Sequence, residues 1–318
     1  MNKYFKNLFI ITLLLIGFVL PVNASHIKFA QISDIHYQPK APENEKSAKL
    51  KFYALKLLDD AIFQINNDKK IDFVLVTGDA ADKPIYEDFE FIYNYLNSNL
   101  KPKWYYTLGN HDVNVNKNFT KKDQIELLNK INPSGFAKDK TYYTFKPKKD
   151  ITFIALDATY DKWVSPGYLP AEQLEFLDNE LKNAKNNPVV IFIHHPTVYP
   201  VKNTNHEIVN DFAIYKILEK YKNPILILGG HYHGTKIKQE DNVIHVASPA
   251  LVSYPNAFRV ISVDNNSKRT IFTFEYKETT LKDIQNKAKT KGFGDCVKWL
   301  RGEEETDRNN VITIDKKK

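Results

Sequence analysis

The sequence has a single cysteine, and it contains neither an internal repeat nor a long low-complexity linker. Cys296 cannot form an internal disulfide, so the fold must rest on a hydrophobic core. We expect Cys296 to be a small buried side chain near Trp299, with pairing to a second chain as the alternative. The residues after position 24 are numerous enough for one large domain with a sizeable core.

A concentrated basic surface is also missing. The chain carries 45 Lys and Arg residues against 38 Asp and Glu residues, for a net charge of +7. The lysines are scattered and intermixed with acidic residues, whereas a protein that binds nucleic acid shows a clustered basic face. We therefore expect no nucleic-acid partner.

The hydrophobic run at the N-terminus is too short for a comfortable transmembrane helix, which needs about 20 residues. Residues 8–20 are apolar, Lys3 and Lys6 precede them, and a small-residue cleavage site ends at Ala24. This pattern predicts a signal peptide over residues 1–24. We expect an exported protein, periplasmic or secreted, with no stable membrane span after cleavage. An uncleaved N-terminal anchor is the alternative.

The first half of the chain alternates strands and helices. Apolar runs predict strands at 27–32, 71–77 and 103–108, and helical spacing predicts helices at 47–65 and 86–96. Such an order implies right-handed crossovers and a largely parallel sheet. Ligands bind at the carboxyl ends of the strands in open sheets of this kind.

The second half is richer in short strands. We expect strands at 142–145, 151–157, 189–193, 225–228, 235–239, 243–246, 258–263 and 270–276, with helices at 171–184 and 210–221. Two packed sheets with helices outside would accommodate this pattern. The main domain is predicted over residues 25–276. Residues 277–318 are predicted to be a polar C-terminal extension with one docking helix near 297–300.

Five short polar clusters follow in order along the chain, and most of them come directly after a predicted strand. They are Asp34-Ile35-His36, Gly78-Asp79-Ala80-Ala81-Asp82, Gly109-Asn110-His111-Asp112, His194-His195-Pro196 and Gly230-His231-Tyr232-His233. Carboxylate and imidazole groups suit first-row divalent metals. Seven carboxylate, imidazole and carboxamide side chains that converge from five strand ends are more than one ion needs. They would hold two, and two close metals commonly serve phosphate ester hydrolysis.

Local spacing supports some of these positions more than others. Asp34 and His36 stand two apart, so in an ideal strand both would point the same way. His231 and His233 have the same spacing after paired glycines, and two buried imidazoles are costly unless they are hydrogen-bonded or metal-bound. A hydrogen-bonded structural pair remains the alternative for this motif taken alone.

The order and spacing of the five clusters resemble the calcineurin-like metallophosphoesterase superfamily over roughly residues 27–275. Within it, the chain looks most like the class III cyclic nucleotide phosphodiesterase branch. The resemblance implies an α/β fold, a four-layer α/β/β/α sandwich of two mixed β-sheets flanked by helices. It also implies two divalent metal ions, for which Mn, Fe and Zn are all compatible with the N and O ligands.

The resemblance further implies a role for each cluster. Asp79 would bridge both ions, the first site would add Asp34, His36 and His233, and the second would add Asn110, His194 and His231. His194 is favoured over His195 because it comes first after the strand. Asp82 stands where purple acid phosphatases carry a tyrosine ligand, so an iron(III)–tyrosinate centre is not expected.

His111 is not a metal ligand in the family pattern. It would hydrogen-bond the phosphate of the substrate and protonate the leaving alkoxide, and the Asp82 carboxylate would orient its imidazole. Asp112 is expected to be a hydrogen-bond acceptor in support. Of the histidines without motif support, we expect His26 and His245 to be structural and leave His206 open.

The expected activity is hydrolysis of small phosphate esters, phosphodiesters in particular, by a water activated between the two ions, with His111 assisting the leaving group. An exported phosphomonoesterase or nucleotide phosphatase is the runner-up, and a catalytically inactive metal-stabilised binding protein is the alternative from another class. Candidates for stacking on a nucleoside are Tyr37, Trp163, Tyr168, Tyr199, Tyr232 and Tyr254. The sequence does not set the oligomeric state.

Overall fold

The structure is a computed structural model that describes residues 24–117, 119–133, 139–162, 164–201, 205–291 and 296–316. Residues 1–23, which make up nearly all of the proposed signal peptide, lie outside the described residues. Trp163 and the side chain of Cys296 lie outside them too. Within the described ranges, no helix has both the length and the apolar character needed to cross a membrane.

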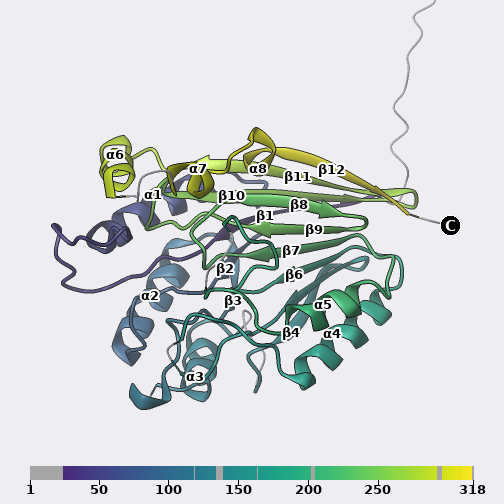
Figure 1. Ribbon diagram of the computed structural model, residues 1–318, viewed down its shortest axis with the longest axis horizontal. Helices are drawn as coiled ribbons and strands as arrows, with labels where there is room; N and C mark the ends of the chain where they lie inside the picture. The colour runs from purple at the N-terminus through teal and green to yellow at the C-terminus, as the bar shows by residue number, and fades with distance from the viewer. Residues whose placement is uncertain are drawn as a thin grey trace, which may run out of the picture.

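Two six-stranded sheets form the centre of the protein (Figure 1). In spatial order, the first sheet consists of β12 (Asn310–Asp315), β11 (Arg269–Glu278), β10 (Ala257–Asn265), β1 (Ser25–Ile32), β2 (Phe73–Thr77) and β3 (Lys103–Thr107). The second consists of β4 (Tyr143–Lys148), β5 (Ile151–Ala155), β6 (Val189–Phe192), β7 (Ile225–Gly229), β9 (Val243–Ala247) and β8 (Lys236–Glu240).

Both sheets are mixed. The strands β1, β2 and β3 run parallel to one another, and β10 pairs with β1 in the antiparallel direction. In the second sheet, β5, β6, β7 and β9 are parallel, whereas β4 and β8 pair antiparallel at the edges. The parallel strands therefore end at common edges, where the polar clusters of the sequence follow them.

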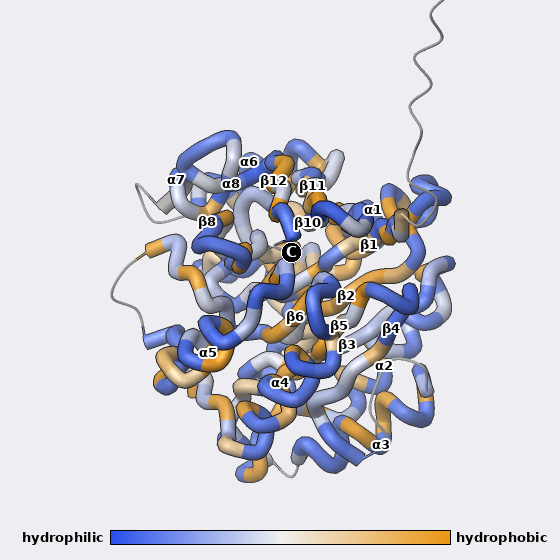
Figure 2. The backbone as a smooth tube through the Cα atoms, turned by 90° about the vertical axis from the view of Figure 1, so that its right-hand side faces the viewer, coloured by the Kyte–Doolittle hydropathy of each residue, from blue (hydrophilic) through white to orange (hydrophobic). Residues whose placement is uncertain are grey.

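The two sheets share one hydrophobic core. The ring of Phe153 on β5 lies 5.2 Å from that of Phe29 on β1 and 5.1 Å from that of Phe73 on β2, both edge to face. Full burial of one such side chain stabilises a fold by about 1.5–3 kcal/mol. Figure 2 shows the same distribution, with apolar residues along the central strands and polar residues on the outer loops.

Helices flank the sheets on the outside. The helices α1 (Ala54–Asn67), α2 (Tyr86–Asn99) and α3 (Lys121–Ile131) add apolar residues to the main core. The helices α4 (Ala171–Ala184) and α5 (Asp211–Leu218) form a second, smaller core with the second sheet. Two mixed sheets flanked by helices are the predicted fold class, which is confirmed.

The first helix begins later than its pattern suggested. A 3₁₀ turn spans Lys51–Tyr53, and α1 starts at Ala54 instead of near residue 47. The reason is a tertiary hydrogen bond, because the amide of Leu50 donates to the carbonyl of Val252 at 2.8 Å. Residues 47–50 therefore pass over the ends of the strands, which matters for the site described below.

The C-terminal extension is more than the predicted polar tail with one docking helix. It contains α6 (Lys282–Lys291), α7 (Cys296–Arg301), α8 (Glu305–Arg308) and β12, which lie together in Figure 1 beside β11. The boundary drawn at residue 276 falls inside β11, and β12 pairs antiparallel with that strand. Ile312 and Ile314 are buried while Val311 and Thr313 are exposed, a period-two pattern typical of an edge strand.

Candidate metal centre

All seven candidate ligands follow strands at the carboxyl edge of the two sheets. Asp34 and His36 follow β1, Asp79 follows β2, Asn110 follows β3, His194 follows β6, and His231 and His233 follow β7. Because β1, β2 and β3 are neighbours in one sheet and β6 and β7 in the other, their ends meet where the sheets pack. The structure brings all seven side chains together.

Asp79 lies at the centre of this group. Its Oδ2 atom is 3.3 Å from Nε2 of His194 and 3.5 Å from Nε2 of His36. Its Oδ1 atom accepts a hydrogen bond of 2.9 Å from the backbone amide of His111. One carboxylate oxygen therefore faces histidines from both sheets.

The first ligand set surrounds Asp34. Its Oδ1 atom is 3.3 Å from Nε2 of His233 and 3.8 Å from Nε2 of His36. Its Oδ2 atom accepts from the Ser33 hydroxyl at 2.5 Å and from the His231 amide at 3.0 Å. Within the described part of the chain, the buried Oδ1 atom has no hydrogen-bond partner. A buried carboxylate oxygen in that condition is costly unless a cation compensates it.

The second ligand set surrounds His194. Its Nε2 atom lies 3.2 Å from Nδ1 of His231 and 3.2 Å from Oδ1 of Asn110. The ligand atoms of Asp79, His194 and His231 lie within 4.8 Å of one another, as do those of Asp34, His36 and His233. Imidazole nitrogens and carboxylate oxygens gathered in this way fit a divalent first-row metal.

Hydrogen bonds outside the cluster fix which nitrogen each histidine presents. Nδ1 of His194 lies 2.7 Å from the Thr77 carbonyl, which can only accept, so Nδ1 carries the hydrogen and Nε2 faces Asp79. Nδ1 of His233 contacts the Ser253 hydroxyl at 2.8 Å, so its Nε2 atom is the one that faces Asp34. Such contacts orient metal-binding imidazoles and raise their affinity for the ion.

The backbone at the ligands is strained. Five of the seven candidate ligands have a positive φ, from 48° at His36 to 64° at His231, and the other three are Asp34, Asp79 and His233. A left-handed conformation costs a non-glycine residue about 1–2 kcal/mol. Asp34 and His36 therefore converge through left-handed turns and not, as expected, through an extended strand. Strain concentrated at one cluster is typical of functional sites.

Close packing leaves no room for a side chain at the neighbouring glycines. A Cβ atom at Gly109 would overlap Oδ1 of Asp79, and one at Gly78 would lie 2.5 Å from Nδ1 of His194. Gly78 also has a φ of +85°, which few other residues adopt. These glycines let the strand ends approach the Asp79 carboxylate from two sides.

Electrostatic effects differ among the histidines. Burial opposes a charge on His194, but the carboxylates of Asp79 and Asp34 overcome it and raise its pKa to about 9. Burial lowers the pKa of His36 to about 3 and holds the pKa of His231 well below its usual value. In the metal-free protein, His194 is therefore the one of these three imidazoles that carries a second proton, and with it a positive charge, at neutral pH.

The predicted pairing of the Asp82 carboxylate with His111 is wrong. Nδ1 of His111 lies 2.7 Å from the backbone carbonyl of Asp82 and donates to it. The Asp82 carboxylate instead lies 3.3 Å from Nδ1 of His36 and 3.0 Å from Nζ of Lys51. The Asp82 carboxylate therefore contacts the Lys51 ammonium and the His36 imidazole and not His111. Although burial alone would raise its pKa, these two groups lower it.

Lys49 is a functional candidate that the sequence reasoning missed. Its Nζ atom lies 3.3 Å from Nε2 of His111 and 3.3 Å from Nδ1 of His36. The predicted helix over residues 47–65 included Lys49 but gave it no role. Because α1 starts only at Ala54, residues 47–50 are not helical and Lys49 reaches His36 and His111 instead. Nothing in the local sequence pattern indicates this.

The remaining sequence candidates occupy supporting positions. Nε2 of His195 lies 2.9 Å from the Ser165 carbonyl, and the ring of His206 lies 4.9 Å from that of His231. Asp112 accepts hydrogen bonds from the amides of Gly109 at 2.6 Å and Asp79 at 3.2 Å. His26 pairs with Asp264 on the surface, and the buried His245 contacts the Thr197 hydroxyl at 2.7 Å.

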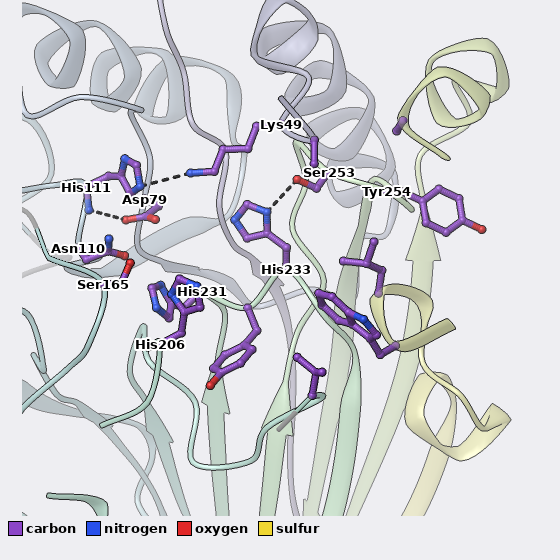
Figure 3. Close-up of a pocket in the computed structure, with 16 residues that line it drawn as sticks. Lys49, Asp79, Asn110, His111, Ser165, His206, His231, His233, Ser253 and Tyr254 are labelled. Atoms are coloured by element: carbon purple, nitrogen blue, oxygen red, sulfur yellow. Dashed lines mark hydrogen bonds between the residues drawn. The ribbon is translucent and has the colours of Figure 1, made fainter. Parts of the chain in front are cut away.

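A cleft of about 470 Å³ opens beside the metal centre. Lys49, Asp79, Asn110, His111 and His233 line it, as labelled in Figure 3. Of the six proposed stacking residues, Tyr232 and Tyr254 border this cleft. Tyr37 instead stacks on Phe91, Tyr199 bonds to Asp211, and Tyr168 stacks on Tyr160.

Comparison with known proteins relates the chain to phosphoesterases. The family model of the calcineurin-like phosphoesterases matches residues 27–235. The chain is 30% identical, over 231 residues, to a 3′,5′-cyclic-nucleotide phosphodiesterase of Nostoc sp., covering 70% of this chain and 78% of the relative. It is 31% identical, over 231 residues, to a probable glycerophosphodiester phosphodiesterase of Arcobacter nitrofigilis, covering 69% and 77%.

Solved structures show the same fold. A dimetal phosphatase from Danio rerio aligns with a TM-score of 0.62 and 15% identity, covering 80% of this chain and 99% of that chain. The family match and the phosphodiesterase relatives confirm the resemblance drawn from the motifs and the expected class of enzyme, a metal-dependent phosphoesterase.

Proposed function

The chain belongs to the calcineurin-like phosphoesterase family, and we propose that it hydrolyses phosphodiesters of small molecules with two divalent metal ions. The observation that carries the proposal is the geometry of Asp79. Its Oδ2 atom faces His36 and His194, one from each ligand set, at 3.5 and 3.3 Å. The Asp34 carboxylate, whose Oδ1 atom faces Nε2 of His233 at 3.3 Å, supplies a second buried negative charge in the described site.

The residues present fit the ions that the family implies. One ion would take Asp34, His36, Asp79 and His233, and the other Asp79, Asn110, His194 and His231. Bound there, Mn, Fe or Zn ions would activate water as a nucleophile and neutralise charge on the phosphoryl oxygens. The amide oxygen of Asn110 adds a neutral ligand, which keeps the site less negative toward a phosphate anion.

His111 and Lys49 serve the leaving group in this proposal. Nδ1 of His111 donates to the Asp82 carbonyl, so Nε2 is the nitrogen that contacts Lys49 and faces the cleft. Together, Nζ and Nε2 hold a proton that can pass to the leaving alkoxide when the P–O bond breaks. The Lys49 ammonium also attracts the non-bridging phosphate oxygens.

Paired substrates test the diesterase assignment. Purified protein with added Mn²⁺ is assayed on bis-p-nitrophenyl phosphate and on p-nitrophenyl phosphate, and we expect the higher kcat/KM for the diester. A preference for the monoester would replace the proposal with a phosphomonoesterase. Turnover of neither substrate by metal-loaded protein would favour an inactive metal-binding protein.

We also propose that the protein is exported, after cleavage that leaves Ser25 as the first residue. Strand β1 begins at Ser25 and pairs with Asn265, so the folded domain starts immediately after the proposed cleavage site. N-terminal sequencing of protein from the envelope fraction of the native cell should begin at Ser25. Recovery of intact Met1 from the cytosolic fraction would reject export.

A further inference from the structure

The cleft beside the metal centre has a second wall that plays no part in the chemistry proposed above. Tyr254, Ala288, Trp299 and Leu300 line it, and three of these four belong to the C-terminal extension. In Figure 3 this wall continues from His233 past Ser253 and Tyr254, on the side away from His111. The family match ends at residue 235, so it does not include these residues.

Helix α7 is fixed directly to the segment that carries the metal ligands. The Thr235 amide donates to the Trp299 carbonyl at 3.0 Å, and the Thr235 hydroxyl donates to the Leu300 carbonyl at 2.7 Å. Thr235 stands two positions after His233. These bonds set the distance between the Trp299 ring and the candidate metal site.

The indole of Trp299 packs on the backbone between those residues. A Cβ atom at Gly234 would lie 2.7 Å from Cε3 and 2.9 Å from Cζ3 of Trp299. Only a glycine therefore lets the ring approach this closely. Trp299 is nevertheless partly exposed and borders the cleft, so one part of the ring is anchored while another faces the cavity.

The rest of the extension is held equally firmly on both sides. The buried Arg259 donates to the Asp307 carbonyl at 2.7 Å and to the Arg308 carbonyl at 3.0 Å, which ties α8 to β10. On the other side, Lys287 of α6 bonds to Glu43 at 2.7 Å, in the loop that leads to Lys49. The extension thus spans from the ligand segment to the Lys49 loop.

We infer that the wall formed by Tyr254, Trp299 and Leu300 is a subsite for an aromatic or heteroaromatic ring on the ester group that stays on the phosphate, on the side of the cleft away from His111 and the leaving group. This inference rests on the proposed function, because it assumes that the phosphate lies at the metal centre. The volume of the cleft, 470 Å³, is that of a small-molecule site.

The composition of the lining favours a planar ring over a flexible alkyl chain. Tyr232, Tyr254 and Trp299 all border the cleft, and aromatic faces bind planar rings by stacking. Ser165, Ser253 and His206 lie in the same lining and offer hydrogen bonds to ring heteroatoms. An alkyl chain would use neither feature.

Two substrates with the same leaving group test the subsite. The metal-loaded wild type, Trp299→Ala and Trp299→Phe are assayed on thymidine 5′-phosphate p-nitrophenyl ester and on methyl p-nitrophenyl phosphate. We expect Trp299→Ala to lower kcat/KM for the thymidine ester by roughly 10- to 100-fold, as for loss of one stacked base, and to leave the methyl ester nearly unchanged. Trp299→Phe should keep most of the preference.

The matched control is Phe63→Ala, which removes an aromatic ring that is 67% exposed on α1 and should change neither rate. Equal losses on both esters, with a lowered melting temperature, would mean that Trp299 is only structural. If the ratio of kcat/KM for the thymidine ester to that for the methyl ester is unchanged in Trp299→Ala, the subsite is also overturned. Calorimetric binding of thymidine 5′-monophosphate and of methyl phosphate gives a second measure of the preference, as a ratio of dissociation constants, without turnover. That ratio tests the subsite even if neither ester is hydrolysed, a result that would count against the proposed function alone.

Discussion

The Nζ atom of Lys49 lies 3.3 Å from Nε2 of His111, beside the Asp79 carboxylate and inside the cleft. Burial lowers the pKa of Lys49, whereas the surrounding carboxylates of Asp79, Asp82 and Asp34 favour its charged form. In the proposed function, a cation in this position would contact both the candidate proton donor and the phosphate of an incoming ester. The family motifs do not include this lysine.

Replacement of Lys49 should therefore impair catalysis without loss of metal. We expect Lys49→Gln to lower kcat/KM on bis-p-nitrophenyl phosphate roughly 10- to 100-fold, the equivalent of one charge-assisted hydrogen bond. Lys49→Arg should keep part of the activity. Metal content by mass spectrometry should stay at the wild-type level. The exposed Lys46→Gln is the control, and equal effects of the two glutamine variants would contradict a specific role for Lys49.

Removal of Asp79 should empty both metal sites at once. Its Oδ2 atom faces both ligand sets, so Asp79→Ala leaves each ion short of one ligand and leaves two cations without the charge that screens them. We expect turnover to fall to the background of the metal-free protein. Near-stoichiometric metal together with wild-type turnover in this variant would refute the bridging role.

The parts of the structure that were predictable depend on local pattern. Apolar runs that alternate with segments of helical spacing predicted the two sheets. Polar clusters directly after those runs predicted the seven side chains that the structure brings together. Lys49 and β12 were missed for different reasons. Lys49 reaches the site because a tertiary hydrogen bond of Leu50 delays α1, which no local pattern contains. The alternation of Ile312 and Ile314 was visible, but it lay in a segment dominated by polar residues.

The Asp82 carboxylate should affect metal affinity more than proton transfer. It lies 3.3 Å from Nδ1 of His36, whose Nε2 atom faces Asp79. We expect Asp82→Asn to weaken metal binding about 10- to 100-fold, as for other groups that orient a ligand imidazole. Saturating metal should restore most of kcat, because the backbone carbonyl of residue 82 still holds His111. Titration with Mn²⁺ measures the effect, and a loss of kcat that metal cannot restore would argue against it.

His111 should serve chemistry and not metal binding. We expect His111→Gln to keep its metals and to lose kcat by roughly 10²–10⁴-fold, as for a positioned general acid. The loss should be greater for alkyl leaving groups than for p-nitrophenolate, which departs with little protonation. A series of aryl and alkyl esters measures this dependence. Loss of metal, or equal losses across the series, would contradict the assigned role.

Metal binding should become tighter as the pH rises, and His194 should set the range. The pKa of His194 in the metal-free protein is about 9, because Asp79 and Asp34 outweigh the effect of burial. An ion at Nε2 must displace that proton, so the apparent affinity should rise up to tenfold per pH unit below about 9. The pKa values of His36 and His231 are lowered, so these two imidazoles are already neutral and release no proton in this range.

Calorimetry separates proton release from the other heats of binding. Mn²⁺ is titrated into metal-free protein at pH 7 in two buffers of different ionisation enthalpy, and the difference in heat gives the protons released. We expect about one proton per protein at pH 7, and an affinity roughly 100-fold higher at pH 8 than at pH 6. His194→Asn should abolish the proton release while the site formed around Asp34 and His233 still binds an ion. A pH-independent affinity in the wild type would show that the proton assigned to His194 is not there.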